Sequence, residues 1–259
     1  MNTIITIEPT LSMFLIVCPF LFLAGLVDAI GGGGGLISLP AYLIAGLPTH
    51  TAIATNKLSS TCGTTLATAR FIKNGLVNFK LAVPSVIMAI IGSAIGAHIS
   101  LIIPEKIMMH VLIVVLPIAA FFVLNKKLFH DNENDVITLD KRTYLTASIA
   151  AFVIGMYDGF YGPGTGTFLL LVFTKLGKLN MEKATGNVKV VNLSSNISAL
   201  VTFILAGKIL LGLGLAASCF SIAGHYVGAG MVVNNGVKII KPIILVVLVL
   251  LLIKVVMGL

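Results

Sequence analysis

Eight long apolar runs dominate the chain and restrict what it can fold into. They lie near residues 11–30, 51–72, 80–101, 106–124, 143–161, 184–206, 211–231 and 237–256. A helix needs roughly 20 mainly apolar residues to cross the hydrocarbon core of a bilayer. Only 10% of the residues are charged, whereas soluble domains hold about 25%. The sequence therefore predicts an all-α polytopic membrane protein whose solvent is the lipid bilayer.

One polar stretch, NKKLFHDNENDVITLDKR at residues 125–142, separates two apolar parts. We interpret it as a linker between a first membrane repeat at residues 1–124 and a second at residues 143–259. It is too short to form a catalytic or ATP-hydrolysing domain, and the chain has no Gly-x-x-x-x-Gly-Lys-Ser/Thr loop. The three cysteines lack metal-type spacing. We therefore expect no enzyme activity, no metal and no cofactor.

The two apolar parts repeat each other, as the halves of many secondary transporters do. At an offset of 130 positions, the matching residues are Gly25, Asp28, Gly32 and Gly34 with Gly155, Asp158, Gly162 and Gly164. Two extra residues in the second part then raise the offset to 132, at which Lys57 matches Lys189. The sequence predicts two homologous halves, each with a glycine-broken helical hairpin followed by three transmembrane helices.

The basic residues indicate how the halves are oriented. The net charge of +8 comes from residues that flank apolar helices, so we expect no nucleic-acid partner. If each hairpin returns to its starting side, every half makes three crossings, and the loops on the two sides carry twelve and three basic residues. Four crossings would divide them nine to six. The positive-inside rule favours the first division. It predicts inverted repeats with both termini outside.

The glycine breaks occur in GLVDAIGGGGGLISLP, residues 25–40, and GMYDGFYGPGTGTFLL, residues 155–170. A helix broken at membrane depth leaves unpaired backbone groups, which are tolerated where they line a cavity. Successive glycine N–H groups can form an anion-binding nest, and a short helix that starts near Leu36 would point its positive end there. We expect two facing breaks to form one anion site near the midplane. The alternative is that these glycines only allow close packing. The candidate residues are Gly32, Gly33, Gly34, Gly35, Gly162, Gly164, Thr165 and Gly166.

Lys57 and Lys189 lie inside predicted helices, at equivalent repeat positions and beside polar residues that include Asn56 and Asn192. Buried charges are costly in membranes, so these four residues are candidates for anion binding. The alternative is that each lysine extends to the membrane interface.

Asp28 and Asp158 are candidates for proton coupling. They would otherwise pair with the lysines or accept hydrogen bonds from the glycine turns. His98 and His225 occupy non-equivalent positions, for which we expect ordinary packing or polar contacts. The Gly-x-x-x-Gly pairs, Gly92 with Gly96 and Gly224 with Gly228, are typical of close helix packing.

The two glycine blocks, with ATNK after the first and the Lys189 segment after the second, resemble the TauE/SafE family, also called the sulfite exporter-like family. The resemblance covers about residues 20 to 255. It implies a multi-pass protein of the bacterial inner membrane that transports small sulfur-containing anions, such as sulfite, sulfonates or sulfoacetate, with a proton or another ion. The alternatives are a transporter of another small organic anion, a passive anion channel, and a membrane-embedded assembly factor. The anion, the direction of transport and the oligomeric state stay open.

Overall fold

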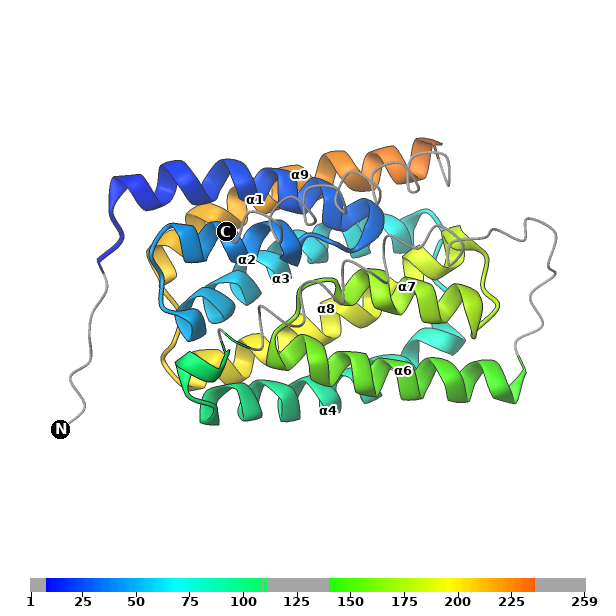
Figure 1. Cartoon of the computed structure of the whole chain (residues 1–259). Helices are drawn as coiled ribbons and strands as arrows, with labels where there is room; N and C mark the ends of the chain where they lie inside the picture. Colours follow the sequence, from blue (N-terminus) through cyan, green and yellow to red (C-terminus); the bar gives the residue numbers. More distant parts are fainter. Residues whose placement is uncertain (1–7, 109, 111–139, 236–259) are drawn as a thin grey trace.

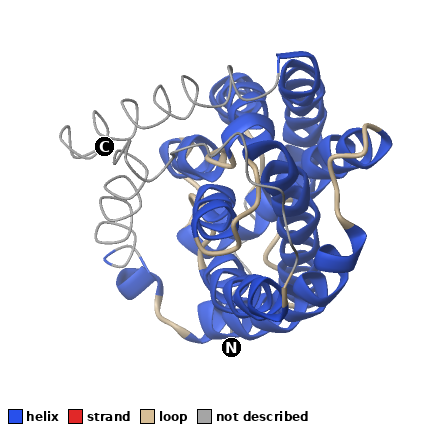
Figure 2. Ribbon diagram, turned by 90° about the vertical axis from the view of Figure 1, so that its right-hand side faces the viewer, coloured by secondary structure: helices blue, strands red, loops and turns tan. Residues whose placement is uncertain are grey.

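The computed structural model describes residues 8–108, 110 and 140–235. This part of the chain is helical and contains no strand, in agreement with the predicted all-α class (Figure 2). The helices are α1 (Leu11–Gly31), α2 (Gly35–Ile44), α3 (Thr49–Lys73), α4 (Phe79–Ile102), α6 (Lys141–Phe160), α7 (Thr165–Lys175), α8 (Met181–Leu205) and α9 (Leu211–Asn235). The predicted linker and the runs near 106–124 and 237–256 lie almost entirely outside the described residues.

Both predicted glycine breaks are present. Helix α1 ends where Gly32 adopts a left-handed conformation with φ of 74°, and the short helix α2 begins three residues later. In the second half, Gly162 and Gly164 have φ values of 97° and 84° between α6 and α7. Side chains other than glycine rarely adopt these angles. The short helices fold back along the longer ones and form the two expected hairpins (Figure 1).

Four described helices, α1, α4, α8 and α9, are long and apolar enough to cross a membrane. Helices α3 and α6 also form where we expected spans, and α3 is the most polar of the long described helices. Helix α3 carries Lys57, Arg70 and Lys73. It packs against both α8 and α9, so many of its polar groups face protein. This placement explains how so polar a helix can lie within a largely apolar bundle.

The packing of the halves is pairwise equivalent. Helix α1 packs on α9 as α6 packs on α4, and α3 packs on α9 as α8 packs on α4. Corresponding helices run in opposite directions; α1 runs to the right and α6 to the left (Figure 1). An inverted repeat would have this arrangement, and its orientation in a membrane stays a prediction.

The Gly-x-x-x-Gly pairs lie at close helix contacts. A Cβ atom at Gly92 or Gly96 would strike the backbone of α6, and one at Gly224 or Gly228 would strike the backbone of α1. Their predicted packing role is confirmed. These contacts hold α4 against α6 and α9 against α1, and they thereby position the interior residues described below.

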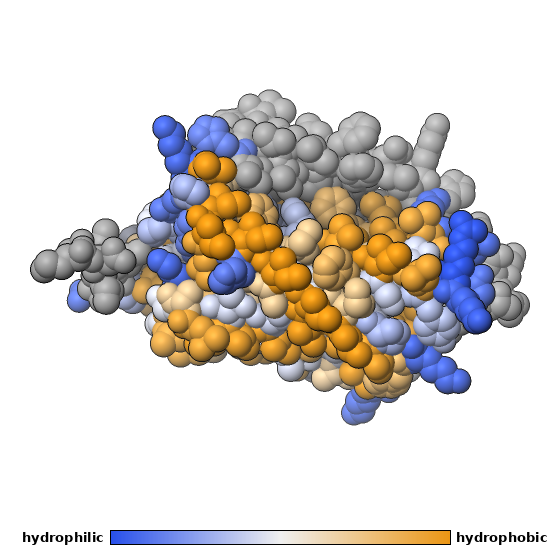
Figure 3. Space-filling view, turned by 90° about the horizontal axis from the view of Figure 1, so that it is seen from below, coloured by the Kyte–Doolittle hydropathy of each residue, from blue (hydrophilic) through white to orange (hydrophobic). Residues whose placement is uncertain are grey.

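The surface of the bundle separates apolar and basic residues. Figure 3 shows an apolar stretch across the middle of one face, with hydrophilic residues gathered toward its ends. Helix α4 presents Ile87, Ile91 and Ile95 to the exterior. Among the described residues, the basic side chains near the end of the bundle where α3 stops and α8 starts are Arg70, Lys73, Lys80, Lys141, Arg142, Lys175, Lys178 and Lys183. Near the opposite end lie Lys106 and Lys208.

Candidate functional site

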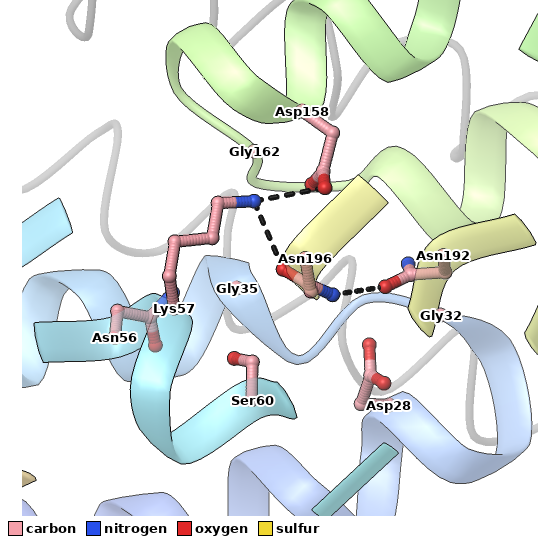
Figure 4. Close-up of a pocket in the computed structure, with 10 residues that line it drawn as sticks. All are labelled: Asp28, Gly32, Gly35, Asn56, Lys57, Ser60, Asp158, Gly162, Asn192 and Asn196. Atoms are coloured by element: carbon pink, nitrogen blue, oxygen red, sulfur yellow. Dashed lines mark hydrogen bonds and ion pairs between the residues drawn. The ribbon is translucent and has the colours of Figure 1, made fainter. Parts of the chain in front are cut away.

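A polar cavity lies where the two glycine breaks meet in the interior (Figure 4). Both hairpins, α3 and α8 contribute to it. The space that a water-sized sphere can occupy in it is about 20 Å³, which is enough for about one water molecule. The cavity is therefore small and polar in this conformation, and it must widen to admit a larger ligand. Its lining consists of Asp28, Gly32, Gly35, Asn56, Lys57, Ser60, Asp158, Gly162, Asn192 and Asn196.

Lys57 of the first half forms an ion pair with Asp158 of the second. The distance from Nζ to Oδ2 is 2.8 Å, and the side chains are 2% and 3% exposed. Lys57 Nζ also donates to Asn196 Oδ1 at 2.9 Å, and Asn196 in turn donates to Asn192. Asp158 accepts a second hydrogen bond from Ser195 Oγ at 2.7 Å. The lysine is thus held inside the protein and does not extend to an interface.

Lys189 of the second half forms the equivalent ion pair with Asp28 of the first. Its Nζ lies 2.6 Å from Asp28 Oδ2, and the lysine side chain is 1% exposed. Asp28 Oδ1 accepts from the Gly34 backbone N–H at 3.3 Å. Asp28 Oδ2 also lies 3.1 Å from His225 Nε2. The two ion pairs therefore cross between the halves, and each aspartate has additional partners.

The two glycine breaks touch each other. A Cβ atom at Gly32 would lie only 2.5 Å from the Cα atom of Gly166. Thr167 Oγ1 donates to the Gly31 carbonyl at 2.9 Å and joins the two hairpins directly. Gly35 lies against Pro163 of the other break. These contacts require residues without side chains, so close packing is one function of the glycine runs.

Eight of the predicted site residues line the cavity: Asp28, Gly32, Gly35, Asn56, Lys57, Asp158, Gly162 and Asn192. The others do not. Gly33, Gly34, Gly164 and Gly166 are buried within the breaks, and Thr165 Oγ1 donates to the carbonyl of Gly162 at 2.7 Å. Lys189 lies behind the cavity, on the carboxylate of Asp28.

The residues outside the predicted set that belong to this region include Ser60, Ser195, Asn196 and His225. Ser60 and Asn192 occupy equivalent repeat positions, so the repeat itself could have indicated Ser60. No such signal exists for His225, whose counterpart at the same offset is Ser93. We expected packing or polar contacts for His225, and its contact with Asp28 is of that kind. Its place beside the ion pair was not predictable.

No cluster of three or more His, Cys, Asp or Glu side chains suited to a metal ion occurs within the described part of the chain. The polar groups around the cavity instead consist of paired charges, amides, hydroxyls and backbone N–H groups. Such groups bind anions through charge-assisted hydrogen bonds.

Comparison with known proteins places the chain among bacterial membrane transporters. The "Probable membrane transporter protein YfcA" of Escherichia coli strain K12 is 36% identical over 87% of this chain and 82% of its own length. The "Probable membrane transporter protein ORF9" of a Sinorhizobium species is 34% identical over 87% and 85%. A Haemophilus influenzae "Probable membrane transporter protein" is 34% identical over 87% of both chains. No solved structure gives a significant match.

The relatives are named as membrane transporters and not as enzymes. The four long apolar helices agree with a multi-pass membrane protein. The family model for the "Sulfite exporter TauE/SafE" matches residues 17–255, nearly the whole chain. The protein is therefore a membrane transporter that belongs to the sulfite exporter TauE/SafE family.

Proposed function

We propose that the protein is a secondary active transporter that moves small sulfur-containing anions, such as sulfite, sulfonates or sulfoacetate, across the bacterial inner membrane with protons. One observation carries the proposal: Lys57, a buried cation, lies on the wall of a cavity between two glycine breaks. The family description agrees with this class of anion. The first repeat, the linker and the second repeat supply the two moving halves and their connection.

The anion binds to Lys57 with help from Asn56, Asn192 and the glycine N–H groups. A sulfite or sulfonate group has three oxygens that can accept hydrogen bonds from an ammonium group and from N–H groups together. In the structure, Asp158 already occupies the ammonium group of Lys57. The anion must therefore compete with this carboxylate. Lys189 can also contact the anion once Asp28 releases its ammonium group. Each lysine thus replaces a carboxylate of the protein with the substrate as its partner.

Transport follows from the crossed ion pairs. Each pair joins one half of the protein to the other, so an anion that displaces a carboxylate weakens a contact between the halves. The halves can then move relative to each other and open the cavity to the opposite side. Asp28 and Asp158 are the candidates for coupling, because the anion competes with each carboxylate for its lysine and changes the charge around it.

A counterflow assay tests the substrate class. The purified protein is reconstituted in liposomes loaded with sulfite, and uptake of labelled sulfite, a sulfonate, a carboxylate and phosphate is measured in parallel. We expect exchange of sulfite and sulfonates. Faster exchange of the carboxylate would indicate the transporter of another organic anion. Flux without counterflow or accumulation would indicate a passive channel, and absence of flux for all four would favour an assembly factor.

A cysteine-accessibility assay tests the inverted topology. In a background without the native cysteines, single cysteines replace Asn74 and Lys208, which are exposed at opposite ends of the bundle. In whole cells, a membrane-impermeant thiol reagent should label position 208 and not position 74, because the basic end faces the cytoplasm. The reverse pattern would contradict the proposed orientation.

A further inference from the structure

His225 gives one half of the site a titratable group that the other half lacks. It lies on α9, is 2% exposed, and contacts Asp28. The equivalent position in the first repeat is Ser93, whose hydroxyl donates to the Ser195 carbonyl at 2.6 Å. The repeat therefore preserved the lysine–aspartate pairs but placed an imidazole beside only one of them.

The surroundings of His225 suit its protonated form. Its Nδ1 lies 2.8 Å from the Ser221 carbonyl, and its Nε2 lies 3.1 Å from Asp28 Oδ2. Both partners only accept hydrogen bonds when Asp28 is ionised, whereas a neutral imidazole carries a single N–H. Imidazolium can donate to both at once.

The same surroundings also accommodate the neutral form. Thr64 Oγ1 lies 3.5 Å from Nε2, and Ser221 Oγ lies 3.4 Å from Nδ1. After loss of a proton, a hydroxyl can turn and donate to the nitrogen that has become an acceptor. Among the described residues around the ring, α1 contributes Asp28, α8 contributes Lys189 through that carboxylate, and α3 contributes only the uncharged Gly63 and Thr64.

A second cavity gives access to the imidazole. It is lined by His225, Ser221 and Ser38, and it adjoins the first cavity along Asp28, Gly35 and Ser60. Ser38 is 2% exposed, and its hydroxyl has no hydrogen-bond partner among the described residues. A buried unpaired hydroxyl is costly unless water reaches it. This cavity thus suits water and protons, whereas the first contains the ammonium group of Lys57.

The charges of the site balance when His225 is neutral, because two buried lysines face two buried aspartates. A bound monoanion would leave one uncompensated negative charge, which is costly away from water. One proton on the imidazole restores the balance. We propose that His225, held by Asp28, binds the coupling proton, while the Lys57–Asp158 side binds the anion. The role of His225 in transport rests on the proposed function. The proton adds to the lone pair of an imidazole nitrogen and leaves from a nitrogen of the same ring after the cavity has opened to the other side.

A titration of the whole protein tests proton binding without any substrate. The protein, labelled with ¹⁵N in its histidines, is placed in nanodiscs, and the imidazole signals are followed by NMR as pH changes. The signal absent from His225→Gln belongs to His225. We expect this signal to change from that of a neutral imidazole to that of a protonated one as the pH is lowered. A single protonation state at every pH at which the protein stays folded would overturn the proposal, whatever anion is transported.

A flux assay tests coupling. With one proton per monoanion, a gradient of one pH unit supports about tenfold accumulation. In liposomes, His225→Gln should lose gradient-driven accumulation of a labelled sulfonate, whereas sulfonate exchange should persist at a reduced rate because the bound anion is no longer neutralised. The exposed His98 supplies the control, since His98→Gln should behave as wild type. Accumulation that persists in His225→Gln, or exchange that disappears with it, would overturn the proposal.

The other half of the protein suggests a second variant that guards against misfolding. Gly63 and His225 correspond to Ser195 and Ser93 at the offset of 132. The double variant Gly63→Ser, His225→Ser therefore copies a pairing that already fits this fold, and the hydroxyl introduced on α3 would donate to Asp28. We expect exchange without gradient-driven accumulation. Full accumulation would contradict the role of His225. If the wild-type protein moves neither sulfite nor sulfonates, the proposed function fails, and the NMR titration still decides the proton site.

Discussion

The two halves of the interior site share their ion pairs and differ in what surrounds them. Asp158 accepts from Lys57 and Ser195, and Asp28 contacts Lys189 and His225. One aspartate therefore has a hydroxyl partner and the other has an imidazole. The difference teaches that the repeat set the positions of the charges, whereas neighbouring residues set the chemistry of each pair.

The room available beside α9 and α4 explains why the two halves differ. A Cβ atom at Gly63 would lie 2.7 Å from His225 Cε1, so the ring needs a glycine there. In the other half, the corresponding position holds Ser195, which itself supplies the hydrogen bond to Asp158. A change at one position of α3 or α8 thus requires a matching change on α9 or α4. The two arrangements are alternative solutions to the same packing problem.

The largest expected effect is on the stability of the protein, and it distinguishes the two ion pairs. Lys57→Met leaves Asp158 buried with only hydroxyl support, and losing one partner of a buried pair costs about 3–5 kcal/mol. Lys189→Met should cost less, because His225 and the Gly34 N–H still hold Asp28. Thermal unfolding in detergent measures both, with exposed Lys208→Met as the control. Equal losses would mean that His225 does not compensate. The double variant Lys57→Met, Asp158→Leu should recover much of the loss.

The next largest expected effect is on anion affinity, and it distinguishes the two lysines. Loss of a charge-assisted contact should weaken binding by roughly 1.5–3 kcal/mol, or about 10- to 150-fold. Lys57→Gln should lie at the upper end of this range, because Lys57 lines the cavity, and Lys189→Gln at the lower end. Calorimetric titration with sulfite measures the affinities. Unchanged affinity in a folded Lys57→Gln protein would count against the proposed anion site.

A smaller expected effect is on proton-coupled accumulation, and it distinguishes the two aspartates. Asp28→Asn removes the carboxylate beside His225, so we expect loss of most of the approximately tenfold accumulation per pH unit. Asp158→Asn should retain gradient dependence, although its anion affinity will change. Sulfonate flux in liposomes, with and without a pH gradient, measures the difference. If both variants keep wild-type gradient dependence, the aspartates are structural and the halves do not differ in coupling.

The smallest effect compares the first helices of the two halves. Asp140 caps α6 by accepting from Thr143 N and Oγ1 at 2.7 and 2.8 Å, whereas Thr10 makes no side-chain cap for α1. These hydrogen bonds hold the pKa of Asp140 below its ordinary value of 3.8. The stabilisation is complete above that value and disappears as pH falls through the lowered pKa.

Asp140→Ala should therefore lower the thermal midpoint slightly at pH 7, and its difference from wild type should shrink below about pH 4. Thr10→Ala should change little at either pH. A difference for Asp140→Ala that grows on acidification would refute the capping role.

The glycine breaks and the buried lysines were predictable because each has a local signature. Five consecutive glycines cannot continue an apolar helix cheaply, and a lysine within an apolar repeat is costly without partners. For Asp28 and Asp158, the sequence left open a role in proton coupling, pairing with the lysines, and hydrogen bonds from the glycine turns. It did not indicate which aspartate meets which lysine. Lys189 and its partner Asp28 are 161 positions apart, and either pairing is compatible with the repeat.

The sequence by itself determined the membrane class, the duplication, the glycine-broken hairpins and the presence of buried charges, because hydropathy, helix propensity and spacing are properties of short segments. Only the tertiary structure decided that the ion pairs cross between the halves and that His225 joins one of them. Those contacts depend on how closely α9 approaches α1 and α3, where small residues such as Gly25 and Gly63 leave room for the imidazole. Periodicity indicates which face of a helix is buried, but the partner on the other side is selected by packing in three dimensions.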